Sequence, residues 1–186
     1  MIENDLKQVF IGNKFFNQEL ENLLGIDNLS IIPEVQFING ISADFCLYKD
    51  NSIISIIECK GDNIGVTEYV RGIGQIMQYQ YFKEKNISGN ISKDCKVFLS
   101  FPNSIMYDCH FDITKFSYPL QTELLIINND NYSPIRINPN IEYQNIQRQL
   151  NTLQISPYYF RDIRISEIYI ILLEIVKRYK VRIIQI

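Results

Sequence analysis

The sequence is poor in the residues that build zinc sites. It contains one histidine, His110, and four cysteines without a Cys-x-x-Cys pair: Cys46, Cys59, Cys95 and Cys109. A structural zinc ion needs four such ligands at closer spacing, so we expect no zinc site. Three of the cysteines lie in apolar or alternating runs, which predicts reduced core residues in a cytoplasmic protein.

Targeting and membrane-spanning patterns are also missing. The first residues, MIENDLKQVF, show no basic region followed by an apolar stretch, so no signal peptide is predicted. The most apolar later run, Ile165–Val176, is short and contains Glu167 and Glu174, which argues against a membrane span. There is no internal repeat and no low-complexity linker. We therefore expect a cytoplasmic protein without a membrane partner.

The chain has no excess of positive charge that would draw it to nucleic acid as a whole. Its formal net charge is -3, but residues 161–186 hold six Lys and Arg against three Asp and Glu. A locally basic surface beside an acidic metal site is found in enzymes that cut DNA, and it is common in other proteins too. The charge pattern alone therefore decides nothing.

The composition is that of a globular protein, with 46% apolar and 21% charged residues in 186 positions. Hydrophobic periodicity predicts a helix over 2–24, broken at Gly12-Asn13 and ending at Gly25. Three strands should follow, with a hairpin turn at Asn39-Gly40. The predicted strands are 31–37, 42–48, 53–60, 96–101, 123–127 and 133–137; the later predicted helices are 67–85, 140–153 and 164–180.

This order of elements predicts an α/β fold with a mixed β-sheet flanked by helices. The glycine-containing loop from Gly61 to Gly65 should lead into the helix over 67–85, with Thr67 as its cap. We expect the main domain to span 1–156, followed by a basic helix and strand over 157–186. Residues 103–120 should form a long loop.

Chemistry concentrates in the hairpin formed by residues 42–60. With Asp50-Asn51-Ser52 as its loop, Lys49 pairs with Ile53 and Asp44 falls opposite Glu58. The two-residue period then makes Asp44, Glu58 and Lys60 project from one face. Two facing carboxylates repel each other unless a cation offsets their charge, and a purely structural strand would favour another apolar residue at position 58.

A divalent cation would resolve both conflicts. Mg²⁺ typically takes one or two carboxylates and keeps several waters, so Asp44 and Glu58 are candidate ligands, with the backbone carbonyl of Cys59 as a third. Mn²⁺ is expected to substitute. Lys60 would orient or help to deprotonate the attacking water and stabilise charge on a phosphodiester.

These residues resemble the motif of the PD-(D/E)xK nuclease superfamily, which includes most type II restriction endonucleases. Ser42-Ala43-Asp44 is followed after thirteen residues by Glu58-Cys59-Lys60, with Ala43 in place of the nominal proline. The similarity covers about residues 2–101. It implies a restriction-endonuclease-like fold and hydrolysis of phosphodiester bonds in double-stranded DNA.

The resemblance implies two further contributions to the site. The family often places a glutamate of its first helix near the metal; Glu3 is most similar to that pattern, Glu19 comes next, and Glu21 is a third candidate. The helix after the motif resembles the family's glutamine helix. Gln75 and Tyr79 match its Gln-x-x-x-Tyr signature and lie on the same side of the helix. In that family the pair is taken to steady the catalytic strand and contact the nucleic-acid backbone.

Each pattern also has a simpler interpretation. The acid–acid–lysine set resembles a cross-strand ion-pair cluster, Gln75 and Tyr79 fit an ordinary amphipathic helix, and Gly72 fits close helix–sheet packing. His110 is expected to be a polar loop residue. The basic residues of 161–186 suit a helix dipole, or alternatively a winged-helix-like element for DNA binding or dimerisation.

The sequence therefore predicts an Mg²⁺-dependent endonuclease acting on DNA, with Asp44, Glu58 and Lys60 as its core and Gln75 in support. Cutting both strands requires two active sites, which favours a homodimer. A repair or junction-resolving nuclease of the same superfamily is one alternative. The other is a nuclease-like module that binds DNA or protein without turnover.

Overall fold

In the computed structural model, the residues described are 1–107, 113, 118–119 and 121–139. The predicted helices near 140–153 and 164–180, the predicted boundary at 156, Cys109 and His110 lie outside this part of the chain. Two helices open the fold, α1 (Glu3–Gly12) and α2 (Lys14–Leu24). Asn13 separates them and its side chain caps α2 by accepting the Phe16 N–H at 3.0 Å. The predicted break and the stop at Gly25, whose φ is 66°, are confirmed.

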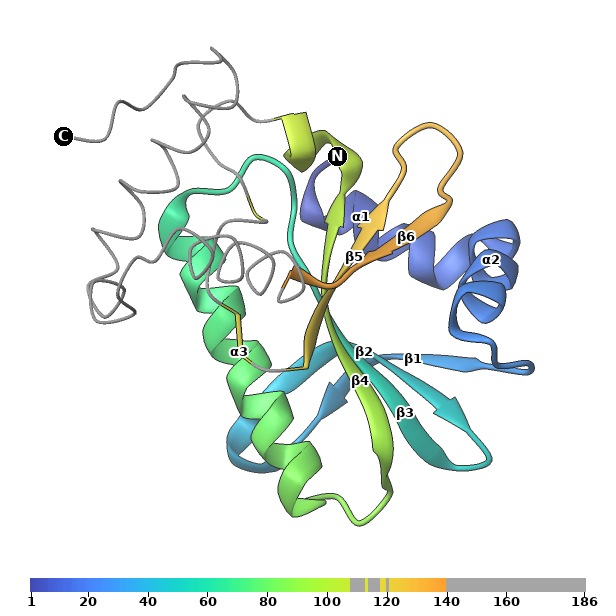
Figure 1. Cartoon of the computed structure of the whole chain (residues 1–186), viewed down its shortest axis with the longest axis vertical. Helices are drawn as coiled ribbons and strands as arrows, with labels where there is room; N and C mark the ends of the chain where they lie inside the picture. The colour runs from blue at the N-terminus through green and yellow to red at the C-terminus, as the bar shows by residue number, and fades with distance from the viewer. Residues whose placement is uncertain (108–112, 114–117, 120, 140–186) are drawn as a thin grey trace, which may run out of the picture. The chain divides into compact units, whose positions relative to one another are not determined.

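Six strands form one mixed sheet in chain order (Figure 1). They are β1 (Ser30–Gln36), β2 (Ser42–Lys49), β3 (Ser52–Cys59), β4 (Ile91–Pro102), β5 (Thr122–Ile127) and β6 (Pro134–Ile137). The first three strands form an antiparallel meander, β3, β4 and β5 run parallel, and β6 returns antiparallel to β5. The parallel β3–β4 connection contains the helix α3 (Val66–Lys85), as parallel pairing requires a crossover. Short 3₁₀ turns lie at Ile38–Gly40 (η1) and Asn103–Tyr107 (η2).

The predicted α/β class, a mixed sheet flanked by helices, is confirmed, and the arrangement is consistent with a restriction-endonuclease-like core. Helices α1 and α2 cover one face of the sheet and α3 covers the other (Figure 1). Each face has its own apolar core, one including Phe10, Phe16 and Phe45, the other Tyr69, Ile76 and Leu99. None of the described helices is long and apolar enough to cross a membrane.

One of the two hairpin turns was predicted correctly from the sequence and the other was not. Asn39 and Gly40, with φ of 63° and 71°, form the predicted turn between β1 and β2. Between β2 and β3, however, Lys49 pairs with Ser52 rather than with Ile53. Asp50 and Asn51 both adopt positive φ, at 48° and 65°, which makes a two-residue turn instead of the predicted three-residue loop.

A register shift between Leu47 and Tyr48 compensates for the shorter turn. Beyond it, Phe45 pairs with Ile57, which is the register expected for the end of the hairpin that holds Asp44 and Glu58. Two boundaries also differ from prediction. The N-cap of α3 is Gly65 rather than Thr67, and β4 begins at Ile91, five residues early, because Ile91 already pairs with Ile53.

The cysteine prediction is confirmed within the described residues. Cys46, Cys59 and Cys95 are buried free thiols. Burial raises the pKa of Cys46 and of Cys95 to about 12, so both remain protonated core residues at neutral pH.

Candidate active site

The candidate site lies where β3 ends between the helix layers. Glu58 and Cys59 are the last residues of β3 and Lys60 follows directly. The Lys60 backbone N–H donates to the carbonyl of Ser100 on β4 at 2.9 Å, so the strand pairing continues through Lys60 and fixes its backbone. Asp44 comes from β2, and the helices contribute Lys7 and Glu3 from α1 and Tyr79 from α3.

Glu58 is almost fully buried, with 3% of its surface exposed. Its Oε1 accepts a hydrogen bond from Lys60 Nζ at 2.8 Å, and its Oε2 lies 2.7 Å from the hydroxyl of Tyr79. Burial raises the pKa of Glu58 and the charge of Asp44 raises it further, while Lys60 and Tyr79 oppose the shift. The site thus holds a carboxyl group whose protonation depends on its neighbours.

Lys60 is buried to a similar degree, with 6% of its surface exposed. A buried ammonium is stable only when it is paired, and Glu58 supplies the partner. Helix α3 passes close above the Lys60 stem at Gly72. A Cβ at position 72 would lie 3.1 Å from Lys60 Cε and 3.3 Å from Leu99 Cδ1. Gly72 therefore permits the close packing of α3 against the Lys60 stem and Leu99.

Asp44 makes its contacts on the α1 side. Its Oδ2 accepts the backbone N–H of Cys59 at 2.7 Å, and its Oδ1 forms an ion pair with Lys7 Nζ at 2.6 Å. The prediction of one shared face needs correction here: Glu58 and Lys60 point to α3, whereas Asp44 is engaged by α1. The physical reason is that the Asp44 carboxylate is held by two donors, the N–H of Cys59 and the ammonium of Lys7, which Glu58 and Lys60 do not share. The two carboxylates still sense each other electrostatically.

Tyr79 links the site to β2. Its hydroxyl lies 2.8 Å from the carbonyl of Ser42 and 2.7 Å from Glu58 Oε2. A phenol has one proton to donate, so it serves one acceptor at a time unless Glu58 carries a proton and donates to the tyrosine oxygen. Burial and the Glu58 charge raise the pKa of Tyr79, so the phenol stays protonated. One proton is thus shared among three oxygens.

Gln75 lies one turn before Tyr79 on α3, and its side chain acts to lower the pKa of the tyrosine. Its Oε1 is buried and has no hydrogen-bond partner among the described residues. Within this part of the chain, Gln75 therefore acts on the site through Tyr79, and the hydrogen-bond partners of Glu58 are Lys60 and Tyr79.

Of the three candidate glutamates, Glu3 alone is connected to Asp44, through Lys7. Glu3 forms an ion pair with Lys7 at 2.9 Å, and Lys7 also contacts Asp44. Glu19 instead accepts a bond from Asn22, and Glu21 accepts the backbone N–H of Leu29 at 2.8 Å, both remote from Asp44. Burial lowers the pKa of Lys7, but its hydrogen bonds and charge contacts with Asp44 and Glu3 outweigh this and raise it overall. Sequence reasoning missed Lys7, although its spacing of four from Glu3 was a visible signal.

The donor chemistry fits a hard divalent cation. Asp44 and Glu58 offer oxygen ligands of the type Mg²⁺ prefers, and that ion needs only one or two carboxylates beside water and substrate. Among the described residues, no group of three or more His, Cys, Asp or Glu is gathered closely enough to enclose a metal. A cation here would be held by these two side chains, with Cys59 between Glu58 and Lys60 as the nearest backbone.

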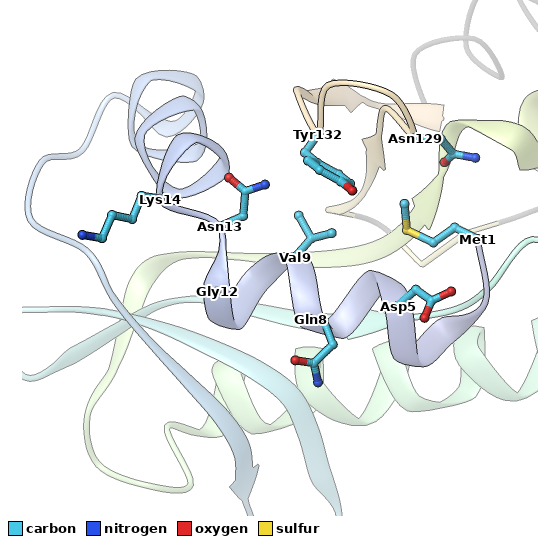
Figure 2. Close-up of a pocket in the computed structure, with 9 residues that line it drawn as sticks. All are labelled: Met1, Asp5, Gln8, Val9, Gly12, Asn13, Lys14, Asn129 and Tyr132. Atoms are coloured by element: carbon cyan, nitrogen blue, oxygen red, sulfur yellow. The ribbon is translucent and has the colours of Figure 1, made fainter.

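A separate groove lies along α1 (Figure 2). It has a volume of about 860 Å³, and Asp5, Gln8 and Gly12 of α1 form one wall while Asn129 and Tyr132 form another. None of Asp44, Glu58 and Lys60 lines it. The groove is therefore distinct from the acidic site.

No family model matches the chain, and no curated protein matches it. Two solved structures are distantly similar. An XisH family protein from Nostoc punctiforme aligns with a TM-score of 0.42 and 16% identity, and an fdxN element excision controlling factor protein from Anabaena variabilis with 0.43 and 15%. Each alignment covers 66% of this chain and 98% of the other. Likeness at this level is too distant to transfer an activity from either protein.

Proposed function

We propose that the protein is a metal-dependent endonuclease of the PD-(D/E)xK type that hydrolyses phosphodiester bonds in double-stranded DNA. The observation that carries the proposal is the buried Glu58–Lys60 pair at the end of β3, with the Asp44 carboxylate beside it. A buried ion pair is a poor device for stability, because desolvation of both charges offsets their attraction. The burial of the Glu58–Lys60 pair therefore favours a chemical role over a purely stabilising one.

Each residue has a definite task in this scheme. Asp44 and Glu58 would hold Mg²⁺ or Mn²⁺, and the ion when bound would polarise the phosphodiester and lower the pKa of water. Lys60 has three donors, of which one is used by Glu58. The other two are available to orient the attacking water and to stabilise negative charge on the phosphate oxygens. Tyr79 holds Glu58 in position, and Gln75 acts through Tyr79 as a positioning residue.

The test is cleavage of supercoiled plasmid and of linear and branched duplexes in Mg²⁺ or Mn²⁺. Asp44→Ala and Lys60→Ala should abolish cleavage while melting temperatures show that both variants fold. Exposed Asp94 and Lys93 offer matched controls, because Asp94→Ala and Lys93→Ala remove the same charges away from the site. Wild-type cleavage rates in either site variant would refute the role of that residue. Preference for branched duplexes would indicate a repair or junction-resolving nuclease.

One observation favours a second candidate, a binding module without turnover. Every carboxylate oxygen of Asp44 and Glu58 already has a protein donor within 2.8 Å. A site closed in this way would hold the strands together without admitting a metal. An electrophoretic mobility shift of duplex DNA with no cleavage in either metal would support that role. For the nuclease, double-strand cleavage implies two active sites, and a homodimer in solution is the corresponding proposal.

A further inference from the structure

Lys7 occupies an unusual position for a helix lysine. Its ammonium lies 2.6 Å from Asp44 Oδ1 and 2.9 Å from Glu3 Oε1, and the side chain is 23% exposed. It therefore forms a bridge between the first helix and the acidic site. The bridge is held by two carboxylates at once, one on β2 and one on its own helix.

The two donors that hold Asp44 differ in how freely they can leave. Oδ2 accepts the backbone N–H of Cys59, which is fixed within β3. Oδ1 accepts the Lys7 ammonium, which sits at the end of a flexible four-carbon stem. A cation that binds Asp44 must compete with one of these donors, and Lys7 is the one able to move away.

Lys7 also has a second partner that it can keep after it leaves Asp44. Glu3 is its partner at the i,i+4 position on α1, a spacing that supports an ion pair without any help from β2. Its 23% exposure leaves part of the side chain in contact with solvent. Release from Asp44 would therefore not strand an unpaired charge in the interior, which is the usual cost of breaking such a pair.

We propose that Lys7 is an exchangeable counter-ion of Asp44, which occupies Oδ1 until a divalent cation binds there and then withdraws to Glu3. This inference rests on the proposed nuclease function and deepens it by assigning a residue that controls metal entry. The site then has two states: one in which Lys7 occupies Asp44 Oδ1, and one in which a divalent cation has replaced it. Metal affinity is set by the strength of the Lys7–Asp44 contact as well as by the carboxylates.

Calorimetric titration of the full chain with Mn²⁺ alone tests the exchange without any cleavage assay. Lys7→Met removes the competing charge and should bind Mn²⁺ about tenfold more tightly, equivalent to about 1.4 kcal/mol. Lys7→Arg should bind it more weakly than wild type, because a guanidinium can engage both carboxylates with a fork of donors. Exposed Lys14→Met, which removes the same charge on α2, should leave the affinity within twofold of wild type.

The double variant Lys7→Met, Asp44→Asn locates the ion. This variant should not show the tighter Mn²⁺ binding of Lys7→Met, because it lacks the carboxylate for which Lys7 and the cation compete. Opposite shifts in Lys7→Met and Lys7→Arg are not expected if Lys7 only ties α1 to the sheet, because then both variants would change melting temperature and leave affinity alone. Equal affinities in wild type and Lys7→Met, or a gain that survives Asp44→Asn, would overturn the exchange.

Failure of this inference is distinguishable from failure of the nuclease. If wild type cleaves DNA and Lys7→Met shows unchanged Mn²⁺ affinity, the exchange is wrong and the nuclease stands. If wild type never cleaves and Lys7→Met still binds Mn²⁺ more tightly through Asp44, the exchange stands and the activity does not. If Lys7→Met binds no Mn²⁺ at millimolar concentration, the exchange is refuted outright.

Discussion

The sheet face beneath α1 and α2 is packed with phenylalanine, whereas the opposite face, beneath α3, buries tyrosine as well as phenylalanine. On the first face, Phe10 stacks on Phe45 and meets Phe16 edge-on, both with ring centroids 4.7 Å apart. On the second, α3 buries Tyr69 and Tyr79. Phenylalanine contributes only apolar area, but each tyrosine carries a hydroxyl that must find a partner.

The buried tyrosine hydroxyls therefore give the α3 face a polar function that the phenylalanine rings of the other face cannot have. The Tyr79 hydroxyl finds its partner in Glu58, so the α3 face accommodates a buried polar centre. The α1 face is largely apolar, and Glu3 and Lys7 approach Asp44 at the start of α1. Substitutions on the first face should therefore act mainly on folding. Removal of the Tyr79 hydroxyl on the second face should act on the site with a smaller effect on folding.

The largest effect is expected from Phe10→Ala. Phe10 is 1% exposed and contacts two other rings, so its truncation should cost about 3–5 kcal/mol of unfolding free energy. Chemical denaturation monitored by circular dichroism measures this loss. Exposed Phe15, in the next helix, gives the control, since Phe15→Ala should change stability by about 0.5 kcal/mol or less. Equal losses in the two variants would contradict the packing described for Phe10.

Tyr79→Phe should cost less, about 1.5–3 kcal/mol, because it removes a hydrogen bond to a charged group while keeping the ring in place. The same change should weaken Mn²⁺ binding and cleavage by freeing Glu58. Tyr81→Phe, on the exposed side of α3, is the matched control and should change neither. Unchanged metal affinity in Tyr79→Phe would show that Glu58 does not depend on the tyrosine for its position.

Gly72→Ala and Gly74→Ala form a closer pair on α3. A Cβ at Gly74 meets nothing within 4 Å, so alanine there should stabilise the helix by about 1 kcal/mol and leave cleavage intact. At Gly72 the same helix gain is offset by contacts at 3.1 Å with Lys60 and 3.3 Å with Leu99. Stability should barely change, while cleavage falls because the Lys60 stem is displaced. Equal cleavage in both variants would count against that account.

The smallest expected effect is a dependence of the free energy of unfolding on pH. Because burial raises the pKa of Glu58 above its ordinary value of 4.5, the folded chain binds this proton more tightly than the unfolded chain does. Its contribution to stability is complete below pH 4.5 and is lost as pH rises through the folded pKa. Denaturation profiles from pH 4.5 upward should show this decline in wild type and not in Glu58→Gln. An identical slope in both would contradict the assignment.

The register that brings Asp44 near Glu58 was predicted from a three-residue loop, and it holds at that end of the hairpin because a register shift offsets the shorter turn. The prediction of the turn was wrong because Asp50 and Asn51 both adopt positive φ. Aspartate and asparagine tolerate this conformation, but their presence does not by itself predict it. The compensating shift at Leu47 and Tyr48 depends on packing across the whole sheet, so no local pattern revealed it.

The site itself was only half visible in the sequence. Glu58 and Lys60 stood out because charge interrupts an apolar strand. Lys7 did not, because a lysine on an exposed-looking helix is ordinary until the helix is docked against Asp44. The contact of Tyr79 with Glu58 likewise depends on how closely α3 approaches β3, which is set by the absence of a side chain at Gly72.

The spread of the site along the chain also sets when it can exist during synthesis. Lys7, Asp44, Glu58 and Lys60 all leave the ribosome before α3 and β4, yet Tyr79 and the Ser100 carbonyl are what position Glu58 and Lys60. Chains grow from the N-terminus, so a nascent chain that ends before β4 carries the charged groups without the Ser100 carbonyl that pairs with Lys60. The centre is therefore assembled only after the crossover is complete, and an unfinished chain holds these charged groups without an organised site.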